Sequence, residues 1–166
     1  LMNRRNLASP RSAQGGFSLI EVMVALLILA FGLLGFALLQ TTSVRFVQSA
    51  NYRTQATNLA NDLIELMRAQ RTDTLAGGAY SSASFAAGAV TANGACAWPT
   101  GAAVTPKTNV ARWQCEVVKT LGEKASAEVQ FTQSTGRVSV AITWGDQRWD
   151  PKEPDSLTTF GLTTFL

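Results

Sequence analysis

The hydrophobic and polar positions divide the chain into stretches of different pattern. In residues 17–39 the side chains are apolar or glycine, interrupted by Ser18 and Glu21 alone. As a helix this run would be about 34 Å long at about 1.5 Å per residue, which is enough to cross the roughly 30 Å apolar core of a bilayer. The pattern therefore predicts a membrane-spanning helix over residues 17–39.

After residue 39 the pattern becomes amphipathic, because apolar residues recur mostly at three- and four-residue spacings between charged ones. This apolar stripe comprises Val44, Val47, Tyr52, Ala56, Leu59, Ala60, Leu63, Leu66 and Met67. No proline occurs in residues 17–71. We therefore expect one continuous helix, with residues 40–71 as an amphipathic half that packs on a globular domain.

The remaining chain changes to loop and strand patterns. Residues 72–109 are rich in Gly, Ala, Ser and Thr, which predicts a long connecting loop. Residues 110–166 predict an antiparallel sheet, with a strand at 110–118, alternation around Val129 and Phe131, and a final strand near 157–165. A further strand has the period-two face Val138, Val140, Ile142 and Trp144.

Ser134, Thr135 and Gly136 predict a hairpin turn between the second and third of these strands. The expected fold class is α+β, in which a long amino-terminal helix packs on a carboxyl-terminal antiparallel sheet.

Composition excludes several kinds of chemistry. The 166 residues include no histidine, so Ser-His-Asp catalysis, Cys-His catalysis and histidine-ligated metals are excluded. Two cysteines are too few for a four-thiolate zinc site. Four acidic residues near the end of the chain lack EF-hand spacing and favour a solvated loop: Asp146, Asp150, Glu153 and Asp155. We expect no catalytic residue, no metal and no cofactor.

The net charge of +3 is located before the apolar run. Three of the 14 basic residues, Arg4, Arg5 and Arg11, lie in residues 1–16, which hold no acidic residue; the other 11 balance the 11 acidic residues. By the positive-inside rule the amino end stays in the cytoplasm and the chain after residue 39 is exported. A cleaved secretory signal fits less well, since the apolar run is longer than the usual core of about 7 to 15 residues.

Glu21 is the exceptional residue of the apolar run, because a carboxylate within a membrane span costs roughly 2–3 kcal/mol. The sequence Gly16-Phe17-Ser18-Leu19-Ile20-Glu21, followed by an unbroken apolar helix, resembles the amino-terminal signature of type IV pilins and pseudopilins. The resemblance implies that a prepilin peptidase removes residues 1–16 as a basic leader by cutting between Gly16 and Phe17, and then methylates the Phe17 amine. Glu21 would pair with the Phe17 amine of an adjacent subunit during assembly.

Further residues narrow the resemblance. Many major pilins carry a proline where this chain has Leu38, which favours a minor pilin or pseudopilin. The segments that resemble the PilV family of minor pilins, the pilus modification proteins, are residues 32–35, Gln40, and residues 52–56, 59–62 and 67–69. That resemblance implies a minor pilin that primes pilus assembly, with consequences for twitching motility and cell adhesion, and that enters the filament or its tip.

The implied partners are the prepilin peptidase, other minor pilins, the major pilin, the inner-membrane assembly platform, a pilus-tip adhesin, and membrane lipid before assembly. The protein would begin as a single-pass inner-membrane protein with a periplasmic domain and end in the extracellular pilus. Two alternatives stay open: a minor pseudopilin of a type II secretion system, and a membrane-anchored periplasmic binding or adhesive module that never polymerises. We expect no direct nucleic-acid binding, since residues 17–166 hold no basic stripe with interleaved aromatics.

Cysteine and tryptophan supply the last expectations. In the oxidising periplasm Cys96 and Cys115 should form a disulfide that ties down the connecting loop, stabilising the domain by about 3 kcal/mol. Trp113 and Trp144 fit inward strand positions. Trp98 and Trp149 lie in or beside loops and are candidate contact residues.

Overall fold

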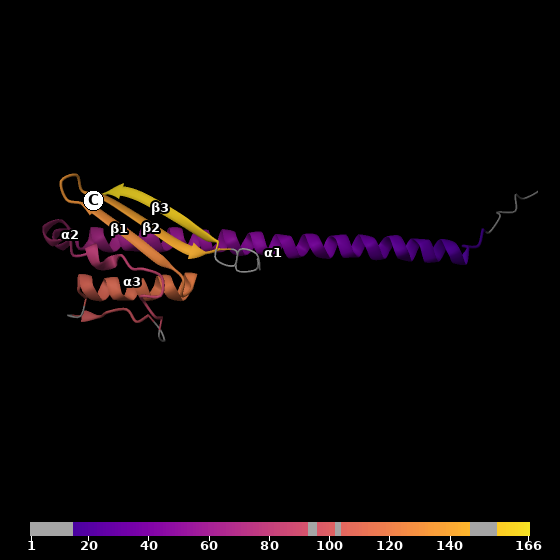
Figure 1. Ribbon diagram of the computed structural model, residues 1–166, viewed down its shortest axis with the longest axis horizontal. Helices are drawn as coiled ribbons and strands as arrows, with labels where there is room; N and C mark the ends of the chain where they lie inside the picture. Colours follow the sequence, from indigo (N-terminus) through magenta and orange to yellow (C-terminus); the bar gives the residue numbers. More distant parts are fainter. Residues whose placement is uncertain (1–14, 93–95, 102–103, 147–155) are drawn as a thin grey trace, which may run out of the picture. The chain divides into compact units, whose positions relative to one another are not determined.

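The computed structural model describes residues 15–92, 96–101, 104–146 and 156–166. These residues form the elements α1 (Leu19–Ala69), α2 (Arg71–Gly77), the short 3-10 helix η1 (Ser81–Ala83), α3 (Pro106–Leu121), β1 (Ser126–Thr132), β2 (Arg137–Gly145) and β3 (Leu157–Phe165), which Figure 1 shows. The predicted α+β class and the single long helix at the amino end are confirmed.

The chain divides into two compact units, an amino-terminal unit of residues 1–44 and a carboxyl-terminal unit of residues 45–166. In the amino-terminal unit, α1 begins where the N–H groups of Glu21 and Val22 donate to the Ser18 carbonyl, at 3.0 and 3.2 Å. Helix-forming Leu, Ala and Met dominate the turns that follow, and no proline interrupts them.

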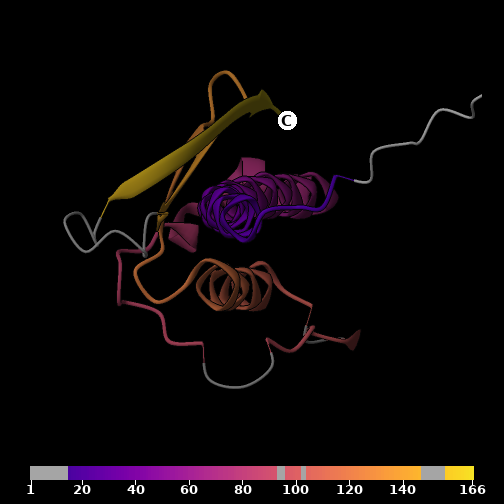
Figure 2. The same cartoon turned by 90° about the vertical axis from the view of Figure 1, so that its right-hand side faces the viewer.

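In the carboxyl-terminal unit, the sheet has the order β1-β2-β3 with both pairs antiparallel. Figure 2 shows the sheet and α3 on different sides of α1. Of the stripe of α1 predicted to face a core, the structure buries Ala56, Leu59, Ala60, Leu63 and Met67, together with Ile64. The prediction is wrong for Val44 and Val47, which are exposed. The inward face of β2 is fully buried, which confirms the period-two prediction for Val138, Val140, Ile142 and Trp144.

The predicted hairpin between β1 and β2 is also confirmed. The Thr135 N–H donates to the Thr132 carbonyl at 3.2 Å, and Gly136 has a φ of 67°. A side chain is disfavoured at such a φ, so glycine fits this position.

The strand predicted at residues 110–118 is wrong, because these residues lie in α3. Their Val and Trp content resembles a strand, yet the buried Val110, Trp113, Val117 and Leu121 recur at helical spacing. Thr105 forms a capping box with Thr108, Pro106 occupies the first turn, and Gly122 ends the helix. Start and stop signals outweigh strand propensity here.

The long connection predicted at residues 72–109 is more structured than expected. It contains most of α2, all of η1 and the first residues of α3. Phe85 also forms an isolated antiparallel bridge with Ala127 of β1. Tertiary packing accounts for the difference, since Tyr80 and Ala83 are buried in the core.

Candidate processing and assembly site

The Gly16–Phe17 peptide lies ahead of the first helical hydrogen bonds. Residues 15–18 have no helical assignment, and the Phe17 side chain is 83% exposed. A Cβ added at Gly15 or at Gly16 would meet nothing within 4 Å. Nothing in the described part of this chain therefore requires glycine at residue 16, whereas a peptidase that closely approaches its carbonyl would.

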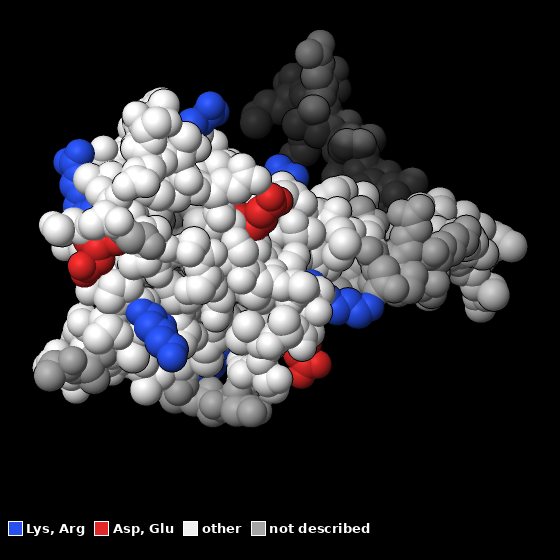
Figure 3. Space-filling view, turned by 60° about the vertical axis from the view of Figure 1, so that its left-hand side comes forward, with Lys and Arg blue, Asp and Glu red and all other residues white. Residues whose placement is uncertain are grey.

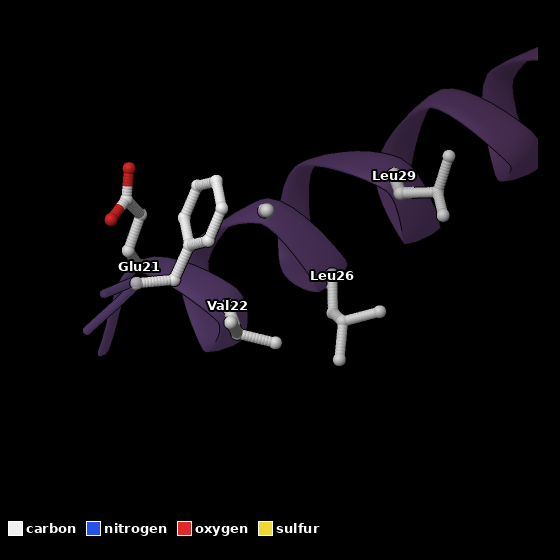
Figure 4. Close-up of a pocket in the computed structure, with 6 residues that line it drawn as sticks. Glu21, Val22, Leu26 and Leu29 are labelled. Atoms are coloured by element: carbon white, nitrogen blue, oxygen red, sulfur yellow. The ribbon is translucent and has the colours of Figure 1, made fainter. Parts of the chain in front are cut away.

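Glu21 lies in the first turn of α1, where the positive end of the helix dipole favours a carboxylate. Among the described residues it has no ion-pair partner. Figure 4 shows Glu21, Val22, Leu26 and Leu29 on these first turns, around a shallow open hollow that Phe17 and Ala25 also line. The walls are apolar apart from Glu21, so an amine brought here would find one carboxylate partner in apolar surroundings.

The apolar surface of α1 continues beyond this hollow. Among the described residues α1 is the helix long and apolar enough to cross a membrane, and none of its most apolar window is buried. A core helix of a soluble protein would bury such a window. The exposed Leu, Ile, Phe and Val side chains therefore need lipid or neighbouring helices as their surroundings.

A family described as the Prokaryotic N-terminal methylation motif matches residues 11–37. No curated protein and no solved structure matches the chain. The matched segment spans the Gly16–Phe17 peptide, Glu21 and most of the apolar run. It supports a type IV pilin-like prepilin that is processed by a prepilin peptidase, anchored through one apolar helix and assembled into pilus-like filaments. Proteins of this class are structural rather than enzymatic.

In the carboxyl-terminal unit the structure joins Cys96 and Cys115 in the predicted disulfide, with their Cα atoms 5.7 Å apart. Because Cys115 is on α3, the bond attaches the segment around Cys96 to a helix rather than to a strand. Trp98, two residues further on, is 63% exposed, as a contact residue would be.

The other tryptophans and the acidic residues have different surroundings. Trp113 and Trp144 are fully buried as expected, although Trp113 lies on α3. The solvated position predicted for Asp146 is wrong, because this residue is 8% exposed and its carboxylate accepts a hydrogen bond from the Ser49 hydroxyl at 2.7 Å. The remaining members of the predicted groups, Trp149, Asp150, Glu153 and Asp155, lie outside the described residues.

The sequence interpretation missed a charged cluster centred on Arg112. Its guanidinium donates to Asp62 and to Glu116 at 2.6 Å each and stacks 3.5 Å from the Trp98 ring centre. Glu116 lies four residues after Arg112, the spacing of an ion pair on a helix. This signal could be recognised only if residues 110–118 were assigned to a helix. On the face that Figure 3 shows, the blue and red side chains are separated by uncharged surface.

Proposed function

We propose that this chain is a minor pilin of the PilV type, which primes pilus assembly together with other minor pilins and enters the filament or its tip. The observation that carries the proposal is the exposed Gly16–Phe17 peptide directly before a helix with Glu21 in its first turn, all within the methylation motif. Leu38 in place of a proline, and the PilV-like segments of α1, support a minor rather than a major pilin.

In this proposal residues 1–16 are the leader, and the Arg4, Arg5 and Arg11 side chains hold it in the cytoplasm. Cleavage before Phe17 removes those charges and creates an amine, which the peptidase methylates. The apolar part of α1 moves from lipid into the filament core, where Glu21 pairs with the Phe17 amine of a neighbour. The carboxyl-terminal unit first lies in the periplasm and contacts the other minor pilins and the major pilin.

Intact-mass measurement of the membrane-extracted chain tests the processing step. We expect a chain that begins at Phe17 and carries one added methyl group. Gly16→Ala should leave the leader uncut, whereas Gly15→Ala, a matched change in equally open surroundings, should be processed normally. An uncut wild-type chain, or equal processing of both variants, would contradict the proposal.

A second measurement separates the pilus from a type II secretion system, since the methylation motif suits either. The full chain should co-purify with other pilus subunits after crosslinking in the membrane. Recovery with secretion components would instead assign it as a pseudopilin.

A further inference from the structure

The two outer edges of the sheet differ in what covers them. On β1, the Phe85 N–H donates to the Ala127 carbonyl at 2.9 Å and the Ala127 N–H donates back to Phe85 at 3.0 Å. The Val129 N–H donates to the Ser84 hydroxyl at 2.9 Å, and that hydroxyl lies 3.2 Å from the Val129 carbonyl. Residues 84 and 85 therefore pair with the backbone of β1 at its outer edge.

The outer edge of β3 has no such cover in the part of the chain that the structure describes. β3 pairs with β2 over all nine of its residues in an unbroken register, from Leu157 opposite Gly145 to Phe165 opposite Arg137. In an antiparallel edge strand the alternate N–H and C=O groups point away from the paired neighbour. Over its nine residues β3 thus presents alternate N–H and C=O groups with which no other described segment pairs, and Figure 1 shows the strand at the edge of the sheet.

β3 also lacks the features that usually protect a sheet edge. Proteins protect such edges with lysine, proline, a bulge or a short strand, because an open edge pairs with other chains. The sequence of β3, LTTFGLTTF, has no charged residue and no proline, and its register has no bulge. Its composition favours a further strand as neighbour.

The core beneath β3 is incompletely covered as well. Phe160 and Leu162 point to the inward face and pack on the core, yet they stay partly exposed, whereas Val140 and Ile142, their neighbours on β2, are fully buried. A further strand along β3 would bring side chains over Phe160 and Leu162. The backbone and the apolar side chains therefore require the same kind of neighbour.

We propose that the outer edge of β3 binds an extended strand of a different pilin-like subunit, which extends the sheet to four strands. The incoming strand would carry apolar side chains on the face that covers Phe160 and Leu162. On its other face, beside Thr159, Gly161 and Thr163, it would carry small or hydroxyl side chains. This inference rests on the proposed function for the identity of its partner.

The direction of β3 argues for a different subunit rather than a second copy. The start of β3 lies near Ser49, because both Ser49 and Thr158 hydrogen-bond to Asp146. Its end lies near Arg68, which hydrogen-bonds to Thr164 at 3.3 Å. β3 and α1 therefore run in the same direction.

An antiparallel pair of two β3 strands would consequently place two copies of α1 in opposite directions. Subunits that enter one membrane from the same side have parallel helices, so they cannot form that pair. A different subunit can pair with β3 while its helix stays parallel to α1, provided that its pairing strand is antiparallel to its own long helix.

Crosslinking of the full chain in its producing cells tests the proposal. A photo-reactive residue at Thr159 should crosslink to a strand of another chain that carries its own methylation motif, identified by mass spectrometry of the linked peptides. The same residue at Glu128, on the exposed face of β1, is the positional control.

Charge at the edge supplies the matched variants. Gly161→Lys with Thr163→Lys adds two positive charges on the exposed face of β3, and Gln130→Lys with Thr132→Lys adds the same charges on β1. A Cβ at Gly161 meets nothing within 4 Å, so the substitution fits the fold. The lysine pair on β3 should lower the yield of the Thr159 crosslink at least tenfold, and the lysine pair on β1 should change that yield by less than twofold. Both variants should unfold at the same midpoint as the wild-type chain, which checks that they fold.

The inference is overturned if Thr159 gives no crosslink to another chain, if it links only to a second copy, or if both lysine pairs act alike. Leader removal is measured in the same samples. If the leader is removed and the protein assembles, but the lysine pair on β3 does not change the crosslinks, only the inference about the edge of β3 is wrong. If the leader of the wild-type chain stays uncut, the proposed function is wrong, and the pilin-like identity of the partner is wrong with it.

Discussion

At the scale of single residues, the Arg112 cluster shows how burial decides the value of a charge. The Arg112 side chain is 1% exposed and is held between Asp62, Glu116 and the Trp98 ring. Removing one carboxylate leaves a buried cation short of a partner, which is more costly than losing the same contact in water. Arg68 and Glu65 form the opposite case, with 45% and 66% of their side chains exposed.

The carboxylates of these two ion pairs, Asp62 and Glu65, both lie on α1 and provide a matched comparison. Asp62→Asn should lower the free energy of unfolding by about 2 kcal/mol, because the buried Arg112 then keeps one of its two carboxylate partners, Glu116. Glu65→Gln should change it by less than about 0.5 kcal/mol. Urea unfolding of both variants measures the difference, and losses of equal size would show that burial of Arg112 does not matter.

The surroundings of Tyr80 indicate how the free energy of unfolding changes at alkaline pH. Burial raises the pKa of the Tyr80 phenol above its usual 10.0, and nearby Asp73 raises it further, while the Asn109 hydrogen bond lowers it. The unfolded chain therefore loses this proton first, so the stabilisation is complete below about pH 10 and declines as the pH rises toward the folded pKa.

Tyr80→Phe should reduce this loss of stability at alkaline pH, because phenylalanine has no proton to lose. At neutral pH the variant should be less stable by about 1 kcal/mol, because Tyr80 hydrogen-bonds to Gln70 and to the Leu66 carbonyl. Unfolding midpoints measured from about pH 8 to about pH 11 test the difference. An unchanged pH dependence in the variant would exclude Tyr80 as its source.

At the scale of elements, the helical conformation of α3 is stabilised by its capping residues and by the buried Trp113. The Thr108 N–H donates to the Thr105 hydroxyl at 3.3 Å, and the Thr105 N–H donates to the Thr108 hydroxyl at 3.0 Å. In the core, Trp113 Nε1 donates to the Leu59 carbonyl of α1 at 2.8 Å. Local capping and tertiary packing together keep residues 110–118 helical despite their strand-like composition.

Loss of the cap tests the local part of that account. Thr105→Ala should lower the free energy of unfolding by about 1 kcal/mol, because it removes the side-chain acceptor of the Thr108 N–H. Thr54→Ala on α1 is the control, since that exposed hydroxyl donates to the Ala50 carbonyl within its own helix and caps no helix end. Thermal unfolding followed by circular dichroism compares them, and equal shifts would contradict a capping role.

At the scale of the whole molecule, the chain combines an exposed apolar helix with a folded domain. None of the most apolar window of this helix is buried among the described residues. In the proposed function membrane lipid covers it first and the neighbouring subunits cover it after assembly. In the proposed function Glu21 is the polar group that distinguishes such neighbours from lipid, because the Phe17 amine of a neighbouring subunit can pair with it.

Glu21→Ala should therefore still allow membrane insertion and leader removal but lower incorporation into filaments. Glu21→Asp, which keeps the charge, should retain more incorporation than Glu21→Ala. Immunoblots of sheared filaments against total membrane protein measure the ratio. Equal incorporation of the alanine variant would argue against a role of Glu21 in assembly.

Much of this organisation could be predicted because it rests on local patterns. The absence of proline fixed the continuity of α1, and alternation gave the buried face of β2 through Trp144. The disulfide between Cys96 and Cys115 could be predicted because the chain has two cysteines. The strand predicted at Val110 failed because composition was weighed above capping signals.

The sequence by itself determined the methylation motif, the apolar helix and the α+β class, since each depends on residue order and periodicity along the chain. The tertiary structure alone decided that Arg112 is buried between Asp62 and Trp98, that residues 84 and 85 cover β1, and that no described segment covers the outer edge of β3. These features join segments far apart in the chain. Their energies come from burial and pairing across that distance, which no local pattern records.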